Sequence, residues 1–186
     1  MNAAKPLLFS MLTSLALTAS AWGDIAAGPE GMVILTVGGD VGHPNRGAAS
    51  EEDATILGKL GVSFDKAVEF DLAGLDALEQ GSFEQSYNDG MFAGTFTGPR
   101  ISAILDAVGL PGSTVYAMAL DGYEAEIPGA YIARYEPILA THLNGRPLGL
   151  GGFGPTTVVF PEVDDPDETE AINSMLPWAT IYLDVE

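Results

Sequence analysis

The chain has 186 residues, a formal net charge of −19 at neutral pH and no cysteine. A charge this negative repels phosphate backbones and anionic membrane surfaces, which excludes nucleic acid as a partner. The absence of cysteine excludes disulfides, thiolate catalysis and thiolate metal sites.

The N-terminal segment has the features of a secretory signal peptide. Lys5 precedes an apolar run, residues 7–19, and the run ends in small residues suited to cleavage after Ala21. The run is shorter than the roughly 20 residues that span a bilayer, which disfavours a membrane anchor. We therefore expect residues 1–21 to be removed on export to the periplasm or the exterior. Residues 22–186 would remain as one domain without a membrane segment.

The mature chain begins with a strand followed by a polar loop. The apolar, β-branched run at residues 32–37 predicts the strand, and the turn-rich loop 38–47 follows it. His43 and Arg46 lie in this loop, where they fit either anion contacts or ordinary loop surface. We favour loop surface.

A second strand and a helical turn come next. Residues 68–72 are expected to form the strand, and leucines on one side of residues 72–78 indicate a short helical turn. Residues 79–89 are polar and are expected to form a surface loop before a strand at residues 91–97.

The next stretch predicts one amphipathic helix. Apolar residues recur at the i, i+3, i+4, i+7 spacing that places them on one buried face. They are Ile101, Ile104, Leu105 and Val108. Pro99 suits the first helical turn, and Gly109 suits the left-handed position just past the helix end.

A hairpin is expected after this helix. Residues 115–120 have the pattern of a strand, and Asp121-Gly122 marks a turn into a short partner strand that ends at Pro128. The stretch therefore predicts a helix packed on antiparallel strands.

The C-terminal third of the sequence predicts several short elements. They are a helical turn at residues 130–135, an extended or helical link at 137–141, a tight turn at Asn144-Gly145, a strand at 156–160, an acidic loop at 162–170 and a last strand at 178–185.

The glycine pattern Gly149-x-Gly151-x-x-Gly154 has dinucleotide-binding spacing. That fingerprint requires a helix whose N-terminal amides hold a pyrophosphate, and here Pro155 and a strand follow instead. A loop is the better interpretation.

The acidic run from Glu162 to Glu170 contains candidate oxygen ligands for a hard cation, of which Asp164, Asp165 and Asp167 are the weak candidates. It lacks the ordered spacing of a calcium loop, so a solvated charge run is expected. We expect no metal site and assign no catalytic residue.

Four blocks of the sequence together resemble the oxidoreductase molybdopterin-binding domain, which has the sulfite-oxidase fold. The blocks are FTGPRISAILDAVG, DGYEAEIP, ILATHLNGRPLGLGGFGPTTVVFP and a terminal strand with Trp178. The resemblance extends from about Met32 to the C-terminus and is closest to small exported members. It implies an α+β fold rich in β-structure, with mixed or antiparallel sheets and a few short helices.

The resemblance also implies a molybdenum held by a pterin dithiolene and one protein cysteine. The corresponding region here, residues 84–89, has no cysteine, and neither a Tyr hydroxyl nor an Asn amide replaces a soft thiolate. The basic residues that anchor the pterin phosphate are replaced by acids in the last strand. The family arginine of the strand at 156–160 is replaced by Thr157 or a neighbour.

These departures favour a non-catalytic binding or accessory module over a molybdopterin-dependent oxidoreductase that lacks the cysteine ligand. A structural or protein-interaction domain is a third alternative. We expect a small anionic ligand or a periplasmic protein as partner, with molybdopterin disfavoured. The candidate binding residues are Tyr87, Asn88, Arg100, Tyr123, Arg134 and His142. Arg100 and Arg134 could hold a carboxylate or phosphate bidentately, although Arg100 could equally pair with a carboxylate such as Asp106.

Overall fold

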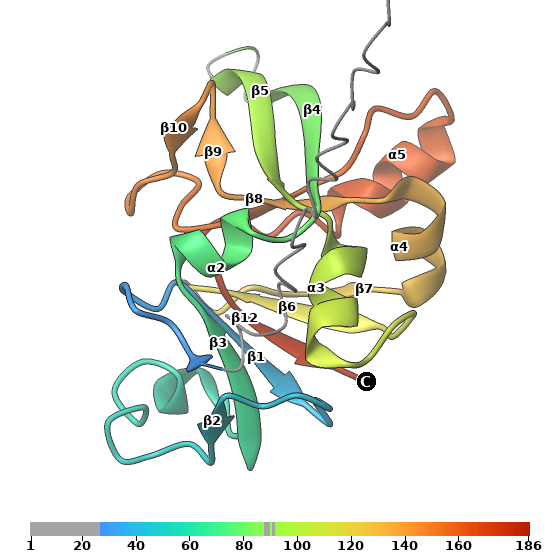
Figure 1. Ribbon diagram of the computed structural model, residues 1–186. Helices are drawn as coiled ribbons and strands as arrows, with labels where there is room; N and C mark the ends of the chain where they lie inside the picture. Colours follow the sequence, from blue (N-terminus) through green and yellow to red (C-terminus); the bar gives the residue numbers. More distant parts are fainter. Residues whose placement is uncertain (1–26, 88–89, 91) are drawn as a thin grey trace, which may run out of the picture.

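A six-stranded sheet forms one half of the molecule in the computed structural model, which describes residues 27–87, 90 and 92–186 (Figure 1). Its strand order is β2-β3-β1-β12-β6-β7. The strands are β2 (Arg46–Gly47), β3 (Lys66–Phe70), β1 (Leu35–Gly39), β12 (Thr180–Val185), β6 (Val115–Ala119) and β7 (Glu124–Ile127). β1 and β12 are parallel, and the other neighbours are antiparallel. The expected signal peptide, residues 1–21, lies outside the described residues.

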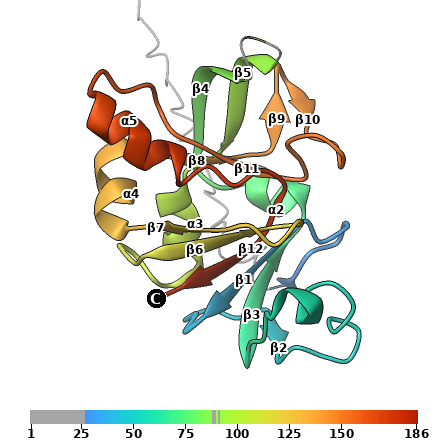
Figure 2. The same ribbon diagram turned by 180° about the vertical axis from the view of Figure 1, so that it is seen from behind.

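The other half contains two smaller antiparallel sheets (Figure 2). One has the order β10 (Arg146–Pro147), β9 (His142–Leu143), β5 (Phe92–Pro99) and β4 (Gln80–Tyr87), and the other pairs β11 (Thr157–Val159) with β8 (Ile138–Ala140). The helices are α2 (Leu72–Asp76), α3 (Ile101–Val108), α4 (Gly129–Tyr135) and α5 (Pro166–Asn173), with a 3₁₀ turn, η1 (Gly58–Leu60). The structure confirms an α+β, β-rich fold with mixed and antiparallel sheets and a few short helices.

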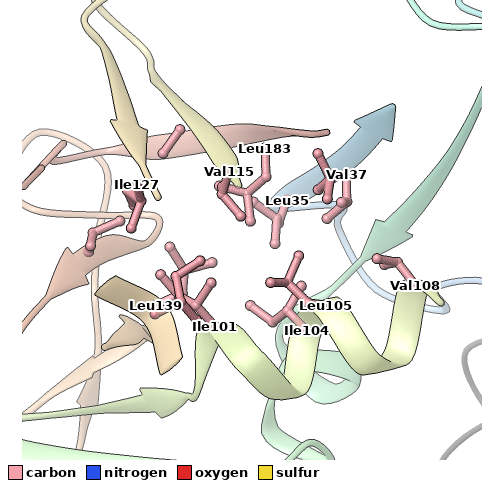
Figure 3. Packing of buried hydrophobic residues seen from close by; sticks show 14 of the residues in the cluster. Leu35, Val37, Ile101, Ile104, Leu105, Val108, Val115, Ile127, Leu139 and Leu183 are labelled. Carbon is pink, nitrogen blue, oxygen red and sulfur yellow. The ribbon is translucent and has the colours of Figure 1, made fainter. Parts of the chain in front are cut away.

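Helix α3 packs its apolar face on the six-stranded sheet and forms the main core (Figure 3). Ile101, Ile104, Leu105 and Val108 are all fully buried, as the spacing predicts. They meet alternate residues of the strands, because side chains of a strand point to opposite faces in turn. These include Leu35, Val37, Val115, Ile127 and Leu183. Truncating one such side chain to alanine would cost about 2–5 kcal/mol.

The helix begins at Ile101, so Pro99 precedes it and does not lie in its first turn as expected. Pro99 is the last residue of β5, and Arg100 is the extended N-cap residue with φ −62° and ψ 139°. The Arg100 N–H donates to the carbonyl of Glu79, so strand pairing continues up to the helix start. Gly109 ends the helix in the left-handed region at φ 82°, as expected.

Residues 80–87 form strand β4, which corrects the prediction of a surface loop there. The strand was missed because it lies at the edge of its sheet and half of its residues are polar and exposed. Phe83 and Tyr87 nevertheless lie on the inner side at a spacing typical of a strand, where they pack on a second core around Phe96.

Half of the expected acidic loop is helix α5, which is a second correction. Asp165 is its N-cap and accepts hydrogen bonds from the N–H groups of Asp167 and Glu168, at 2.9 and 3.2 Å. Pro166 occupies the first turn, where its missing N–H costs nothing. Carboxylates in the first turn also interact favourably with the helix dipole, so the acidic composition stabilises this helix.

The turn predictions for residues 144–154 are confirmed. Asn144 and Gly145 both have positive φ, 52° and 72°, and connect β9 to β10. The glycines of the dinucleotide-like pattern lie in a loop that leads directly into strand β11 and not into a helix. Among the described residues, no helix is long and apolar enough to cross a membrane.

Candidate functional site

The sequence-predicted residues Tyr87 and Arg100 lie at opposite ends of one β-hairpin. β4 and β5 pair from Gln80 opposite Pro99 at one end to Tyr87 opposite Phe92 at the other. At 3.2–3.4 Å per residue, the length of β4 separates the two ends by roughly 23 Å. The structure therefore does not bring these two side chains into one cleft.

Tyr87 belongs to an aromatic cluster at the tip of the hairpin. Its ring lies 5.6 Å from Phe96, 5.5 Å from Phe153 and 6.1 Å from Trp178, measured between ring centroids. Burial among these rings raises the pKa of the Tyr87 phenol to about 12. Phe153 could not be predicted as part of this cluster, because its loop has no periodic pattern.

A hollow of about 250 Å³ lies on the other side of Tyr87, between β4 and α5, and is called the β4 hollow below. Ser86 and Tyr87 line it from β4, and residues 160–164 and α5 complete it. Glu162 and Asp164 are its charged lining residues. A shallower neighbouring hollow is lined by Glu84 and Glu162. Neither has Lys, Arg or His among its described lining residues, so the local potential is negative.

Arg100 lies at the opposite end of the hairpin and contacts two carboxylates. Its Nε is 3.4 Å from Glu79 Oε1 and its Nη1 is 3.7 Å from Glu136 Oε2. Glu136 ends α4 in the left-handed region at φ 49° and also accepts a hydrogen bond from the Ser102 hydroxyl at 3.1 Å. The pairing of Arg100 with loop carboxylates was an open alternative, with Asp106 as an example. The observed partners are Glu79 and Glu136.

Arg134 lies on α4 and faces α5. Its Nη1 is 2.6 Å from Glu168 Oε1, and its guanidinium lies 4.9 Å from the centroid of the Tyr135 ring. The Tyr135 hydroxyl donates to the other Glu168 oxygen. Glu168 therefore connects the two helices. The side chain of Arg134 is still 65% exposed, so one side of its guanidinium remains open to solvent.

His142 is part of a group that resembles a hydroxyl–imidazole–carboxylate relay. Its Nδ1 lies 2.8 Å from Thr141 Oγ1 and 3.9 Å from Asp76 Oδ1. In a working relay the hydroxyl and the carboxylate bind different ring nitrogens, whereas here both face Nδ1. Thr141 is also only 1% exposed. The geometry therefore gives no nucleophile to a substrate.

Tyr123 lies in the turn between β6 and β7, apart from the hairpin. Its hydroxyl donates to the carbonyl of Ser174 at 2.8 Å, which connects this turn to the end of α5. Asn88 lies outside the described residues. The five candidates that the structure describes are thus distributed over the β4 tip, the β5–α3 junction, α4, β9 and the β6–β7 turn.

The acidic segment does not converge on a cation site. Asp165 caps α5, while Asp164 and Asp167 are exposed on either side of it. Among the described residues, no group of three or more His, Asp or Glu side chains could hold a metal ion.

Arg46, which was expected in a surface loop, lies in strand β2 and pairs with two carboxylates. It contacts the carboxylates of Asp53 and Glu69, and its guanidinium lies 5.0 Å from the centroid of the Phe64 ring. These contacts connect the segment between β2 and β3 to the outer face of the sheet, where Phe64 packs in a small third core.

The fold class indicated by the comparison with solved structures is sulfite-oxidase-like. The chain is similar to the crystal structure of the sulfane dehydrogenase SoxCD from Paracoccus pantotrophus, with a TM-score of 0.51 and 16% sequence identity. The similarity covers 81% of this chain but only 37% of that chain. At this identity it shows the fold alone. No family model and no curated protein matches the sequence.

Proposed function

We propose that this chain is an exported, non-catalytic binding or accessory module built on a sulfite-oxidase-like fold. The observation that carries the proposal is the surroundings of Tyr87. The chain has no cysteine, and this side chain packs among aromatic rings beside a hollow lined by Glu162 and Asp164.

The β4 hollow does not fit an anionic pterin cofactor. A pterin phosphate requires basic partners, and the described lining of both hollows beside β4 contains acids and no base. Carboxylates here would repel the phosphate, and no thiolate is present to hold molybdenum. No step through this cofactor is therefore assigned.

A small ligand with a positive charge or with hydrogen-bond donors suits the β4 hollow better. Glu162 and Asp164 supply acceptors, the aromatic body of Tyr87 supplies an apolar wall, and the Asn173 amide supplies both donor and acceptor groups. The volume of about 250 Å³ suits a ligand of few atoms.

Anion binding at Arg100 or Arg134 is the second candidate. The two contacts of Arg100 with carboxylates, 3.4 and 3.7 Å, are longer than the 2.7–2.9 Å typical of charge-assisted hydrogen bonds. A carboxylate or sulfate could therefore make shorter contacts with this guanidinium than Glu79 and Glu136 do.

Metal analysis tests the non-catalytic proposal. The full chain is produced in a host that makes molybdopterin and inserts it into the host's own enzymes. The protein is then recovered from the exported fraction. We expect molybdenum no higher than in a blank preparation. Stoichiometric molybdenum with a pterin absorbance would overturn the proposal.

Thermal unfolding with two probes separates the two ligand candidates. Putrescine is the cationic probe and sulfate the anionic one. We expect putrescine to raise the melting temperature of the wild type but not of a Glu162→Gln, Asp164→Asn double variant. Stabilisation by sulfate that is lost in Arg100→Ala or Arg134→Ala would instead support the anion candidate. An unchanged melting temperature with both probes would exclude ligand binding both at the β4 hollow and at the two arginines.

A further inference from the structure

Exposed apolar side chains of this chain gather around one hollow at the start of β1. The large apolar side chains with substantial exposure among the described residues are Met32, Val33, Ile56, Tyr123, Leu150 and Trp178. Four of these six line a single hollow of about 330 Å³, called the β1 hollow below. The four, which we call the apolar patch, are Met32, Val33, Ile56 and Leu150.

The apolar patch is built from segments that are distant in sequence. Residues 32–36, 53–57, 150–155 and the neighbourhood of Leu120 and Ile181 all contribute. These segments lie along the same edge of the molecule in both views (Figures 1 and 2). An apolar surface assembled in this way is typical of an interaction site, because single exposed apolar residues scatter on ordinary surfaces.

Two features stabilise the walls of the β1 hollow: a strained backbone position and an ion pair. Ala179 has a positive φ of 51°, its N–H donates to the Phe153 carbonyl and its own carbonyl accepts from the Leu120 N–H. Arg46 forms an ion pair with Asp53, and both residues line the hollow. A non-glycine residue in this backbone region is strained, and such outliers concentrate at functional sites.

We propose that the apolar patch binds a segment of another protein that carries large apolar residues flanked by lysines or arginines. Met32 and Leu150 are 73% and 68% exposed, so they project from the rim and a small ligand inside the hollow would leave them in water. A protein segment laid across the rim covers them and gains the free energy of their burial.

The charges near the apolar patch determine which sign of charge the partner segment should carry. The charged residues that line the β1 hollow are Arg46, Asp53 and Glu69, which together carry one net negative charge. The exposed Glu51 and Glu52 lie in the same segment as Asp53 and add two carboxylates. A second copy of this chain would bring a net charge of −19 against itself, whereas a basic segment is attracted. This inference does not depend on the β4 hollow.

Fluorescence anisotropy with two matched peptides tests the inference. One fluorescein-labelled peptide has leucines and a phenylalanine flanked by lysines, and the other replaces the lysines with glutamates. We expect the lysine peptide to bind wild type, with an affinity that falls as salt is added, and the glutamate peptide to bind much more weakly. A Met32→Gln, Leu150→Gln double variant should lose at least about tenfold in affinity.

The matched control is Ala130→Gln, an exposed position on α4 outside the patch, which should bind as the wild type does. Equal binding of the two peptides, no binding of either, or equal losses in the control and the double variant would overturn the proposal. Concentration-dependent sedimentation that disappears in the double variant would also overturn it, because a second copy would then cover the patch.

Discussion

The guanidinium of Arg46 and the carboxylate of Asp53 form an ion pair that connects the segment after β2 to the sheet. The Asp53 side chain is only 13% exposed, and it also accepts hydrogen bonds from the Ser50 N–H and hydroxyl. The Arg46 guanidinium, as the main cause, and the hydrogen bonds from Ser50 lower the pKa of the Asp53 carboxyl from its ordinary value of 3.8 to about 2.

The stability of the protein should therefore depend on Asp53 in acid. The folded-state pKa lies below the unfolded one, so the contribution is present above about pH 4 and is lost as the pH falls from about 4 to about 2. Asp53→Asn should lower the free energy of unfolding by about 1–2 kcal/mol at neutral pH and remove this step from the pH profile. Urea unfolding at several pH values measures both effects.

The control for this prediction is Asp40→Asn. Asp40 also pairs with a cation, Lys66, but its side chain is 94% exposed. This variant should leave the midpoint of urea unfolding within error, because water screens an exposed ion pair. A larger loss in Asp40→Asn than in Asp53→Asn would contradict the assignment.

The Tyr87 phenol should lose its proton at a higher pH than the phenol of an ordinary tyrosine does. Burial raises its pKa to about 12, so ultraviolet absorbance should show a phenolate component near that pH. Because the folded-state pKa exceeds the unfolded one, its contribution to stability is present below about pH 10 and is lost as the pH rises towards 12. Burial also raises the pKa of the Tyr182 phenol above its ordinary value.

Tyr87→Phe should remove part of that late absorbance. An unchanged late component in this variant would show that Tyr87 is not the buried phenol.

Gly145 should be required for the turn between β9 and β10. Its φ of 72° disfavours any residue with a Cβ, while a Cβ at this position would meet nothing within 4 Å. Gly145→Ala should therefore cost about 1 kcal/mol from backbone conformation alone. Gly149→Ala, also in open space but without a positive φ, is the control and should be near neutral in the same denaturant titration.

Asp165 should stabilise α5 as its N-cap. Asp165→Ala removes the acceptor for two backbone N–H groups and should cost about 1 kcal/mol. Asp164→Ala, at the exposed neighbouring position, should leave the midpoint of unfolding within error. If both variants lose the same amount, the effect comes from charge and not from the cap.

The sequence alone predicts the elements whose pattern of buried residues is regular. The four apolar residues of α3 and the Asn144-Gly145 turn each have one dominant physical explanation, and the structure confirms both. β4 and α5 were missed because polar residues dominate an edge strand and a surface helix. Their signals, alternating Phe83 and Tyr87 and the Asp165-Pro166 cap, are local and weak.

The candidate site was less predictable than the fold, because a site depends on which ends of the elements meet. Tyr87 and Arg100 are close in sequence, yet the hairpin register separates them. The apolar patch is the opposite case, since Met32 and Leu150 are far apart in sequence but line one hollow. Neither relationship has a signature in residue spacing.

The position of β12 has a consequence for how the protein folds. This strand is parallel to β1 and antiparallel to β6, so it completes the centre of the six-stranded sheet. During synthesis β1 emerges early and has to wait for residues 180–185 before the two can pair. Pairing between such distant segments slows folding and leaves strand edges open to aggregation until it occurs. Protection of the chain by a chaperone should therefore matter more for this protein than for one whose central strands all pair with near neighbours in sequence.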